Sequence, residues 1–193
     1  MTEPDAALNA MLAEYESLRT ESQQAIQNRV SVTNFTFGAL AVVIAGLLSS
    51  NVSEVLAGIV GMVFVPQIAK AGLLIWLGEY NRSQRAGRWI ADLEKRMNEL
   101  VQHDAVGWER RLQAQRGSSG HMSYPYVANA VITIGMGWAG GVVGAVFLFD
   151  EIADATCATA TGLSVAGICL AFALVEWWFL RYFARHWREA REG

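Results

Sequence analysis

Two charged residues stand in stretches of the sequence that are otherwise apolar. Lys70 interrupts the stretch from Val55 to Gly78, and Glu176 lies within residues 155–183. A charge surrounded by hydrocarbon costs several kcal/mol unless it finds a partner or reaches water. An ion pair between Lys70 and Glu176 would satisfy both charges, and this is our first interpretation.

Two other interpretations of these charges follow from the same residues. In one, Lys70 extends its ammonium group to lipid headgroups while Glu176 reaches Arg181 or water. In the other, Lys70 and Glu176 belong to a polar path through the apolar stretches, together with Gln67 and Asn129. The sequence leaves all three interpretations open.

No constellation of catalytic or metal-binding residues stands out elsewhere. The histidines His103, His121 and His186 are far apart in the chain, and each has at most one acidic residue at helical spacing. A metal site needs more ligands than this. The chain also lacks a P-loop, a dinucleotide-binding fingerprint and a nucleophile elbow. We therefore expect a protein that is not an enzyme, with no catalytic residues, no metal and no cofactor.

Glycines crowd one of the apolar stretches. Gly137 and Gly141 are four residues apart, as are Gly140 and Gly144. Small residues at this spacing let a second helix approach closely, which is how helices associate in lipid. That second helix belongs either to the same chain or to another copy, so a homo-oligomer through this face is an open alternative. Pro66 removes a backbone hydrogen bond in the middle of its stretch, where we expect a helix kink.

The composition indicates what surrounds these residues. The 193 residues are 53% apolar and 17% charged, and the mean hydropathy is +0.25. A soluble globular domain carries about 25% charged residues. A net charge of −3 gives no field that recruits a polyanion, so we expect no nucleic-acid partner. These values indicate an integral membrane protein in contact with a lipid bilayer.

Four stretches are long and apolar enough to be membrane spans, which need about 20 residues each. They cover about residues 33–50, 55–78, 127–149 and 155–183. Four buried helices of a soluble protein are the alternative, but the remaining polar residues are too few to cover them. We therefore predict an all-α fold, an integral membrane four-helix bundle built from two transmembrane hairpins with very short outer loops.

The prediction divides the chain into five parts. They are a cytoplasmic N-terminal helix (1–32), a first transmembrane hairpin (33–78), a cytoplasmic helical segment with a linker (79–124), a second transmembrane hairpin (125–184) and a cytoplasmic tail (185–193). Of the 15 Lys and Arg residues, all except Lys70 lie on the side of the two ends and the middle segment. Positive residues concentrate on the cytoplasmic side, so we expect both termini in the cytoplasm. The first 29 residues are polar and acidic, so we expect no cleavable signal peptide.

The two cytoplasmic segments each carry a narrow apolar stripe at helical spacing, which is typical of a helix that needs a partner. The first stripe comprises Leu8, Met11, Tyr15, Leu18, Ser22 and Ala25, and the second comprises Ile90, Leu93, Met97 and Leu100. The two stripes pair with each other, or each packs on its counterpart in an oligomer. We expect a cytoplasmic protein partner to bind through residues 1–30 and 79–112.

Short motifs form a recognisable set between residues 14 and 126. They are Glu14-Tyr15, Leu18-Arg19 with Glu21, Asn28-Arg29, Trp76-Leu77-Gly78-Glu79, Arg85-Ala86-Gly87 followed by Ile90 and Leu93-Glu94, Gly107-Trp108-Glu109, and Tyr124-Pro125-Tyr126. Together they resemble a family of small uncharacterised bacterial four-span membrane proteins that is common in actinobacteria. The resemblance implies a multi-pass protein of the bacterial plasma (inner) membrane with cytoplasmic helices, and it supplies no catalytic residues. The layout is also similar to multi-span effector modules of bacterial anti-phage systems, which damage the membrane when triggered.

Three functional hypotheses follow. In the first, which we favour, the protein is a non-enzymatic oligomeric membrane module whose cytoplasmic helices bind a partner or signal and whose spans respond, for example as a pore. In the second, it is a membrane anchor or assembly protein without transport. In the third, it is a small ion channel or transporter that uses Lys70 and Glu176.

Overall fold

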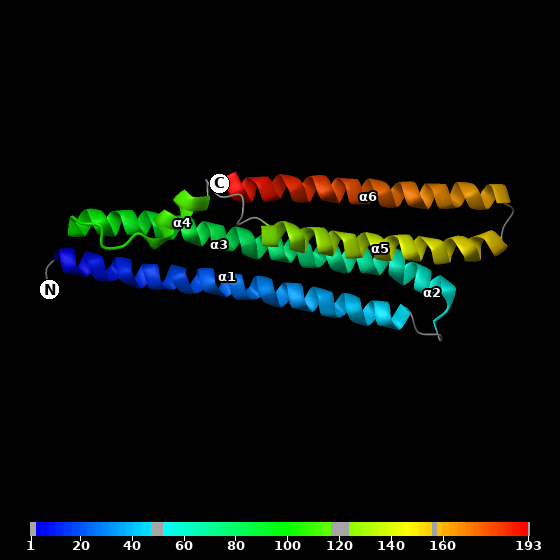
Figure 1. Cartoon of the computed structure of the whole chain (residues 1–193), viewed down its shortest axis with the longest axis horizontal. Helices are drawn as coiled ribbons and strands as arrows, with labels where there is room; N and C mark the ends of the chain where they lie inside the picture. The colour runs from blue at the N-terminus through cyan, green and yellow to red at the C-terminus, as the bar shows by residue number, and fades with distance from the viewer. Residues whose placement is uncertain (1–2, 48–51, 117–123, 156–157, 193) are drawn as a thin grey trace. The chain divides into compact units, whose positions relative to one another are not determined.

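The computed structural model describes residues 3–47, 52–116, 124–155 and 158–192, and within these ranges it contains helices and no strand. The helices are, in chain order, α1 (Glu3–Leu47), α2 (Glu54–Ile59), the π-helix η1 (Val60–Phe64), α3 (Val65–Val101), α4 (Trp108–Arg116), α5 (Tyr124–Ala155) and α6 (Ala158–Glu192) (Figure 1). The all-α class predicted from the sequence is confirmed.

Helix α1 is a single helix of 45 residues, whereas the sequence analysis separated a cytoplasmic helix from a span beginning at residue 33. No glycine or proline stands between Asp5 and Phe37, so nothing in this segment interrupts the helical hydrogen bonds. As a result α1 continues from polar residues into apolar ones without a break (Figure 1).

The second apolar stretch forms α2, η1 and α3, which follow one another directly. The side-chain oxygen of Ser53 accepts a hydrogen bond from the backbone N–H of Leu56 (3.4 Å) and caps α2. In η1 the turns are wider, and the N–H of Val65 donates to the carbonyl of Val60. Pro66 follows at once and has no N–H to donate. The π-helical turn thus directly precedes the segment in which the sequence predicts a kink at Pro66.

Contacts within the chain divide it into two compact units. Unit 1 comprises Met1–Ser31 and Trp76–Val127, and unit 2 comprises Val32–Ile75 and Ala128–Gly193. Helices α1 and α3 each supply one part to unit 1 and another part to unit 2. The boundary on each helix lies close to the predicted change from cytoplasmic to membrane-spanning residues.

Unit 2 has a small apolar core between its helices. Leu40 of α1 and Val65 and Ala69 of α3 are buried there. Partly buried side chains surround these three: Val43, Leu47, Ile68 and Met136. In contrast, many large apolar side chains of unit 2 point outward, among them Phe35 (77% exposed) and Val42 (73% exposed). A soluble monomer rarely exposes so much apolar surface, whereas helices that face lipid do.

Among the residues that the structure describes, three helical segments are long and apolar enough to cross a membrane: Asp5–Leu47, Glu54–Val101 and Pro125–Asp150. They contain the second and third predicted spans and residues 33–47 of the first, whose residues 48–50 lie outside the described residues, so the helices are compatible with a membrane protein. The fourth predicted span falls mostly in α6, but the side chains of residues 158–166 and of Cys169 lie outside the described residues.

Unit 1 is built from the polar parts of α1 and α3 together with α4. Ile90, Leu93 and Met97 of the second predicted stripe are buried, and so is Ala25 of the first. The other members of the first stripe are half-buried: Leu8, Met11, Tyr15, Leu18 and Ser22. Leu100, at the end of the second stripe, is exposed, whereas the other nine residues of the two stripes lie on covered faces of helices in the same unit. An ion pair between Arg82 of α3 and Glu21 of α1 (2.9 Å) joins the two segments.

Candidate functional site

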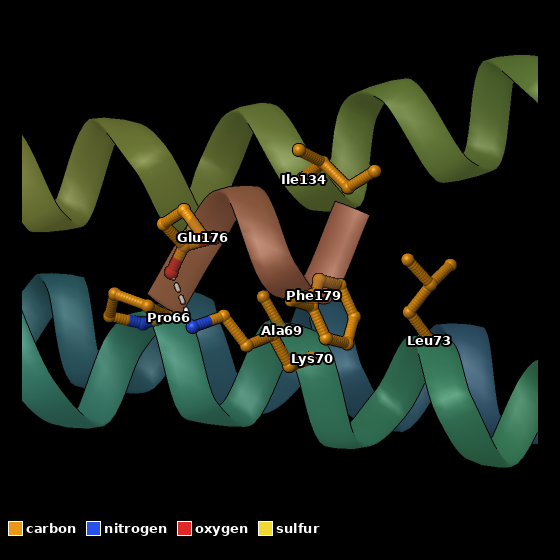
Figure 2. A pocket seen from close by; sticks show the side chains of 8 residues that line it. Pro66, Ala69, Lys70, Leu73, Ile134, Glu176 and Phe179 are labelled. Atoms are coloured by element: carbon orange, nitrogen blue, oxygen red, sulfur yellow. Dashed lines mark ion pairs between the residues drawn. The ribbon is translucent and has the colours of Figure 1, made fainter. Parts of the chain in front are cut away.

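The structure brings Lys70 and Glu176 together in unit 2. The ammonium nitrogen Nζ of Lys70 on α3 forms an ion pair with the carboxylate oxygen Oε1 of Glu176 on α6 (Figure 2). The side chains are only 11% and 3% exposed. The ring of Phe179, one turn further along α6, lies 5.7 Å from Nζ and adds a cation–π contact. Lys70 therefore contacts the carboxylate of Glu176 and one aromatic face in place of water.

A small cavity lies beside the ion pair. Its walls come from α3, α5 and α6 and are apolar apart from the two charges, with Leu73, Ile134 and Phe179 among the lining side chains (Figure 2). The cavity volume is about 10 Å³, which gives room for about one water molecule. Neither Nζ of Lys70 nor Oε1 of Glu176 has a hydrogen-bond partner among the described residues beyond the ion pair itself. A water in this cavity would therefore find charged groups to bind.

Helical spacing explains why these side chains meet. On α3, Pro66, Lys70 and Leu73 recur every three or four residues and are all buried. On α6, Glu176, Phe179 and Phe183 follow the same spacing and are the buried positions among its described side chains. The contact that α6 offers to the other helices of unit 2 is therefore a narrow line of residues, which begins with the one charge, Glu176.

Two other residues of the predicted polar path lie elsewhere. Gln67 is exposed, because it is on a different face of α3 from Lys70. Asn129 of α5 is half-buried and does not line the cavity. Of the four residues that could have formed a polar path, the structure therefore joins only Lys70 and Glu176.

The glycines of α5 pack against other helices of the same chain. A Cβ added at Gly144 would lie 2.6 Å from the carbonyl oxygen of Gly58, and one added at Gly61 would lie 3.0 Å from the Cα atom of Gly144. Gly140 faces Val65 in the same contact. Only glycine allows the backbones to approach this closely. This face of α5 is therefore occupied by α2, η1 and the start of α3.

The other two predicted glycines complete the packing around α5. A Cβ added at Gly137 would lie 3.2 Å from the Cβ of Ala69, next to the cavity. One added at Gly141 would lie 3.1 Å from ring atom Cε2 of Phe172 on α6. The glycines therefore set the close spacing of α3, α5 and α6 that brings Lys70 within reach of Glu176.

A second polar site, in unit 1, was missed by the sequence analysis. Glu94 of α3 is completely buried, and its two carboxylate oxygens accept hydrogen bonds from the backbone N–H groups of Glu109 and Arg110 (3.0 Å each). These N–H groups belong to the first turn of α4, which lacks partners within the helix. Glu94 therefore acts as a cap supplied from another helix, favoured by the partial positive charge at the start of α4.

Asn98 holds the connection between α3 and α4 in the same way. Its side-chain oxygen accepts hydrogen bonds from the N–H groups of Ala105 (2.9 Å) and Val106 (3.0 Å), and its amide nitrogen donates to the carbonyl of Val106 (2.6 Å). The signal in the sequence was the pair of polar residues 94 and 98, four apart, beside the apolar stripe. Their partners are backbone groups, which the sequence does not reveal.

Two ion pairs at the surface of unit 1 shift the pKa values of Asp104 and Arg82 from their ordinary values. A hydrogen bond from Arg110 lowers the pKa of the Asp104 carboxyl, and the positive charge of Arg110 acts in the same direction. A hydrogen bond to Glu21 raises the pKa of the Arg82 guanidinium. Both groups stay charged near neutral pH, so these pairs are structural contacts of unit 1.

Aromatic residues gather around Arg29 in unit 1. The guanidinium carbon of Arg29 lies 5.5 Å from the ring centre of Tyr80 and 5.4 Å from that of Tyr126. Trp76 stacks on Tyr80 with ring centres 5.7 Å apart. This cluster joins α1, α3 and α5.

The described residues hold no group of three or more His, Cys, Asp or Glu side chains that could bind a metal ion. The chemistry that the site does support is charge pairing in an apolar surrounding. Comparison with protein-family models, curated proteins and solved structures finds no match to this chain.

Proposed function

We propose that the protein is a non-enzymatic module of the bacterial inner membrane. In this proposal the apolar parts of the helices of unit 2 lie in the bilayer, unit 1 and both termini lie in the cytoplasm, and unit 1 binds a protein partner or signal. The apolar helices respond to that partner by opening a path through the membrane. The distribution of Lys and Arg and the resemblance to small bacterial membrane proteins support this compartment and orientation.

The observation that carries the proposal is the buried ion pair between Lys70 and Glu176. An anchor that only holds a protein at the membrane needs apolar residues and no charges. Ionisable residues inside membrane-spanning segments are rare, and they mark functional sites by default. Compared with packed apolar residues, a buried ion pair adds little or no stability. We therefore assign the pair a role in function: it holds the helices closed.

The surroundings of the pair support a closed state. The cavity beside it is about 10 Å³, too small to pass a hydrated ion. Opening requires α6 to move away from α3. Among the described side chains of α6, the buried ones are Glu176, Phe179 and Phe183, and Phe172 packs against Gly141 of α5, so these are the contacts that such a movement must break.

The long helices support a role for unit 1 as the receiver. α1 and α3 each run without a break from the polar residues of unit 1 into the apolar residues of unit 2. A partner that displaces one of these helices in unit 1 therefore acts on the same helix in unit 2.

A homo-oligomer stays part of the proposal, but through a contact other than the glycine face that the sequence analysis left open. The glycine face of α5 is filled within the chain by Gly58, Gly61 and Val65. A second copy must therefore use one of the outward apolar faces, such as that of α1 around Val42.

Leakage from liposomes tests this function. We would reconstitute the full chain into liposomes that contain a self-quenched dye and compare Lys70→Leu, Glu176→Leu and the double variant with the unchanged protein. Gln67→Leu is the matched control, because Gln67 is on the same helix but exposed. Removing one partner of a buried ion pair costs about 3–5 kcal/mol, whereas replacing both with apolar residues is close to neutral.

We expect the two single variants to leak at least tenfold faster than the unchanged protein, the control and the double variant, which stay closed. If all five proteins are equally tight, the ion pair does not hold a path closed, and an anchor becomes the better function. If the unchanged protein leaks and the double variant does not, the pair conducts, and the protein is a channel.

The anchor is the second candidate function, and the packing of unit 1 favours it. Glu94 and Asn98 fix α4 against α3 through hydrogen bonds to its backbone. Such a rigid unit suits a surface that binds a partner permanently.

A further inference from the structure

One face of α6 changes along its length from apolar to aromatic to basic. Residues 170, 174, 177, 181, 185 and 188 recur every three or four positions, so they lie on one face of the helix. Leu170 (62% exposed) and Leu174 (57% exposed) come first, Trp177 follows (55% exposed), and the last three residues are Arg181, Arg185 and Arg188. All six are exposed.

The aromatic residues on this side of α6 contact one another and one arginine. The guanidinium carbon of Arg181 lies 4.6 Å from the ring centre of Trp177. Trp178 stacks on Tyr182 with ring centres 5.7 Å apart, and both rings are exposed. A planar guanidinium held on an indole ring keeps its N–H groups directed sideways, where an acceptor can reach them. Rings with an apolar body and a polar edge favour the level of lipid headgroups.

Positive charge dominates the end of this face. Between residues 177 and 188 the chain has three arginines and no acidic residue. Arg185 forms an ion pair with Glu189 (3.0 Å), which neutralises one of the three charges. Arg181 has no acidic partner among the described residues. Within the described residues, Arg181 and Arg188 are thus two exposed positive charges without an acidic partner.

We propose that this face of α6 binds an anionic phospholipid. The phosphate of the headgroup lies among Arg181, Arg185 and Arg188, whose guanidinium groups pair with phosphate oxygens through two parallel hydrogen bonds. An acyl chain lies along Leu170 and Leu174, and the Trp177 ring contacts the region between the headgroup and the chain. Leu174 and Arg181 are seven residues apart, or about 10 Å along the helix axis, which a single lipid molecule can cover.

The order of residues along the face favours a lipid over a soluble anion. A free phosphate needs only the arginines, and it leaves the exposed leucines and Trp177 unexplained. A lipid contacts every residue of the face, since its acyl chain, the region below its headgroup and its phosphate follow one another in the same order as the leucines, Trp177 and the arginines. This inference rests on the proposed position of unit 2 in the bilayer, but it does not depend on opening or on the ion pair of Lys70.

Native mass spectrometry of the full chain in detergent tests the inference. Phosphatidylglycerol is the probe, phosphatidylethanolamine is the lipid without net charge, and glycerophosphoglycerol is the headgroup without acyl chains. The variant carries Arg181→Gln, Arg185→Gln and Arg188→Gln. The control removes the same charge from exposed positions of unit 1, through Arg88→Gln, Lys95→Gln and Arg96→Gln.

We expect the α6 variant to bind phosphatidylglycerol at least tenfold more weakly than the unchanged protein, and the control to change less than twofold. Phosphatidylethanolamine binds more weakly and equally to all three. Millimolar glycerophosphoglycerol does not displace the lipid. Equal loss in both variants means that binding follows net charge alone, and displacement by the headgroup means a soluble-anion site; either result overturns the inference.

Two further measurements keep the result interpretable. Replacing the same three arginines with lysine preserves the charge but removes the paired hydrogen bonds, so we expect a smaller loss, of about threefold. If the glutamine variant no longer elutes as a single species, the lysine variant is compared with the unchanged protein instead. An unchanged lipid affinity in a folded lysine variant and in the control would then reject the paired hydrogen bonds between arginine and phosphate. In the liposome assay the α6 variant stays closed, which separates this inference from the proposed function.

Discussion

A lysine and a glutamate that are both almost fully buried must neutralise each other. Lys70 and Glu176 do so with a single contact, and neither of the contacting atoms has another hydrogen-bond partner among the described residues. Such an arrangement leaves hydrogen-bonding capacity unused, and so it gains less than a fully bonded pair would. At the residue scale this favours a contact that can be broken over one that serves only stability.

A double-mutant cycle measures how strongly the two charges depend on each other. We expect Glu176→Leu and Lys70→Leu each to destabilise the protein in detergent by about 3–5 kcal/mol, because each leaves a buried charge without a partner. The double variant loses much less than the sum. Unfolding by a denaturing detergent, followed by circular dichroism, gives the free energies. Additive losses would show that the two side chains do not interact.

Asp104 gives a prediction for the pH dependence of unit 1. Its folded pKa is lowered by the hydrogen bond from Arg110, so the interaction contributes stability above the unfolded pKa of 3.8 and loses it as pH falls through the lower, folded value. Asp104 is largely exposed, so the contribution is small. Carboxyl titration by NMR should give a lower pKa for Asp104 in the unchanged protein than in an Arg110→Gln variant. Equal values would contradict the ion pair.

At the scale of elements, the close approach of α5 to η1 and its neighbours sets the geometry of unit 2. Gly58 and Gly61 lie one turn apart, and they face Gly140 and Gly144 across the contact. The widened turn of η1 falls at this contact. We attribute the position of Lys70 to this packing, since it fixes how far α3 stands from α5.

Adding one methyl group tests the glycine contact. Gly144→Ala places a Cβ 2.6 Å from the carbonyl oxygen of Gly58, so a backbone must move, at a cost of about 1–3 kcal/mol. Gly135→Ala is the control, because a Cβ there has no neighbour within 4 Å. Thermal unfolding in detergent should separate the two variants clearly. Equal melting temperatures would mean that α5 does not pack as described.

Glu94 is the corresponding test for α4. Glu94→Gln replaces one of its acceptor oxygens with an NH₂ group, which cannot accept from the N–H of Glu109 or Arg110. The loss of a hydrogen bond to a charged group costs about 1.5–3 kcal/mol, so we expect α4 to detach. Hydrogen exchange of residues 105–116 should rise in this variant and stay unchanged in Glu99→Gln, which alters an exposed glutamate. Unchanged hydrogen exchange in the Glu94→Gln variant would contradict the role of Glu94 as a cap of α4.

At the scale of the whole molecule, the hydrophobic pattern of the sequence predicted the helices and their covered faces better than it predicted which residues contact each other. The apolar stretches and stripes of the sequence appear as helices and as covered faces, because periodicity alone decides which side of a helix is apolar. The charges at positions 70 and 176 were conspicuous for the same reason. The unbroken α1 was missed because a change from polar to apolar residues looks like a boundary, although no helix-breaking residue stands there.

Partners were harder to predict than faces. The glycine spacing of α5 predicted close packing, but whether it packs within the chain depends on Gly58 and Gly61, which lie far away in the sequence. Glu94 and Asn98 bind backbone groups of the connection to α4, and backbone groups carry no sequence signal. Periodicity fixes the orientation of a residue on its own helix, and only the tertiary packing fixes what it meets.

The position of unit 2 in a bilayer is the central claim, and cysteine labelling measures it most directly. In a variant with Cys157→Ser and Cys169→Ser, we would introduce single cysteines at Val42 and Val142, which are exposed in unit 2, and at Gln23 and Arg88, which are exposed in unit 1. A maleimide that cannot cross membranes is added to inverted vesicles and to intact spheroplasts.

Although all four positions are exposed in the chain, we expect only positions 23 and 88 to react in inverted vesicles, because lipid covers positions 42 and 142. In spheroplasts positions 23 and 88 are protected, since they lie in the cytoplasm. Rapid labelling of positions 42 and 142 in intact vesicles would mean that unit 2 faces water, and it would contradict the central claim.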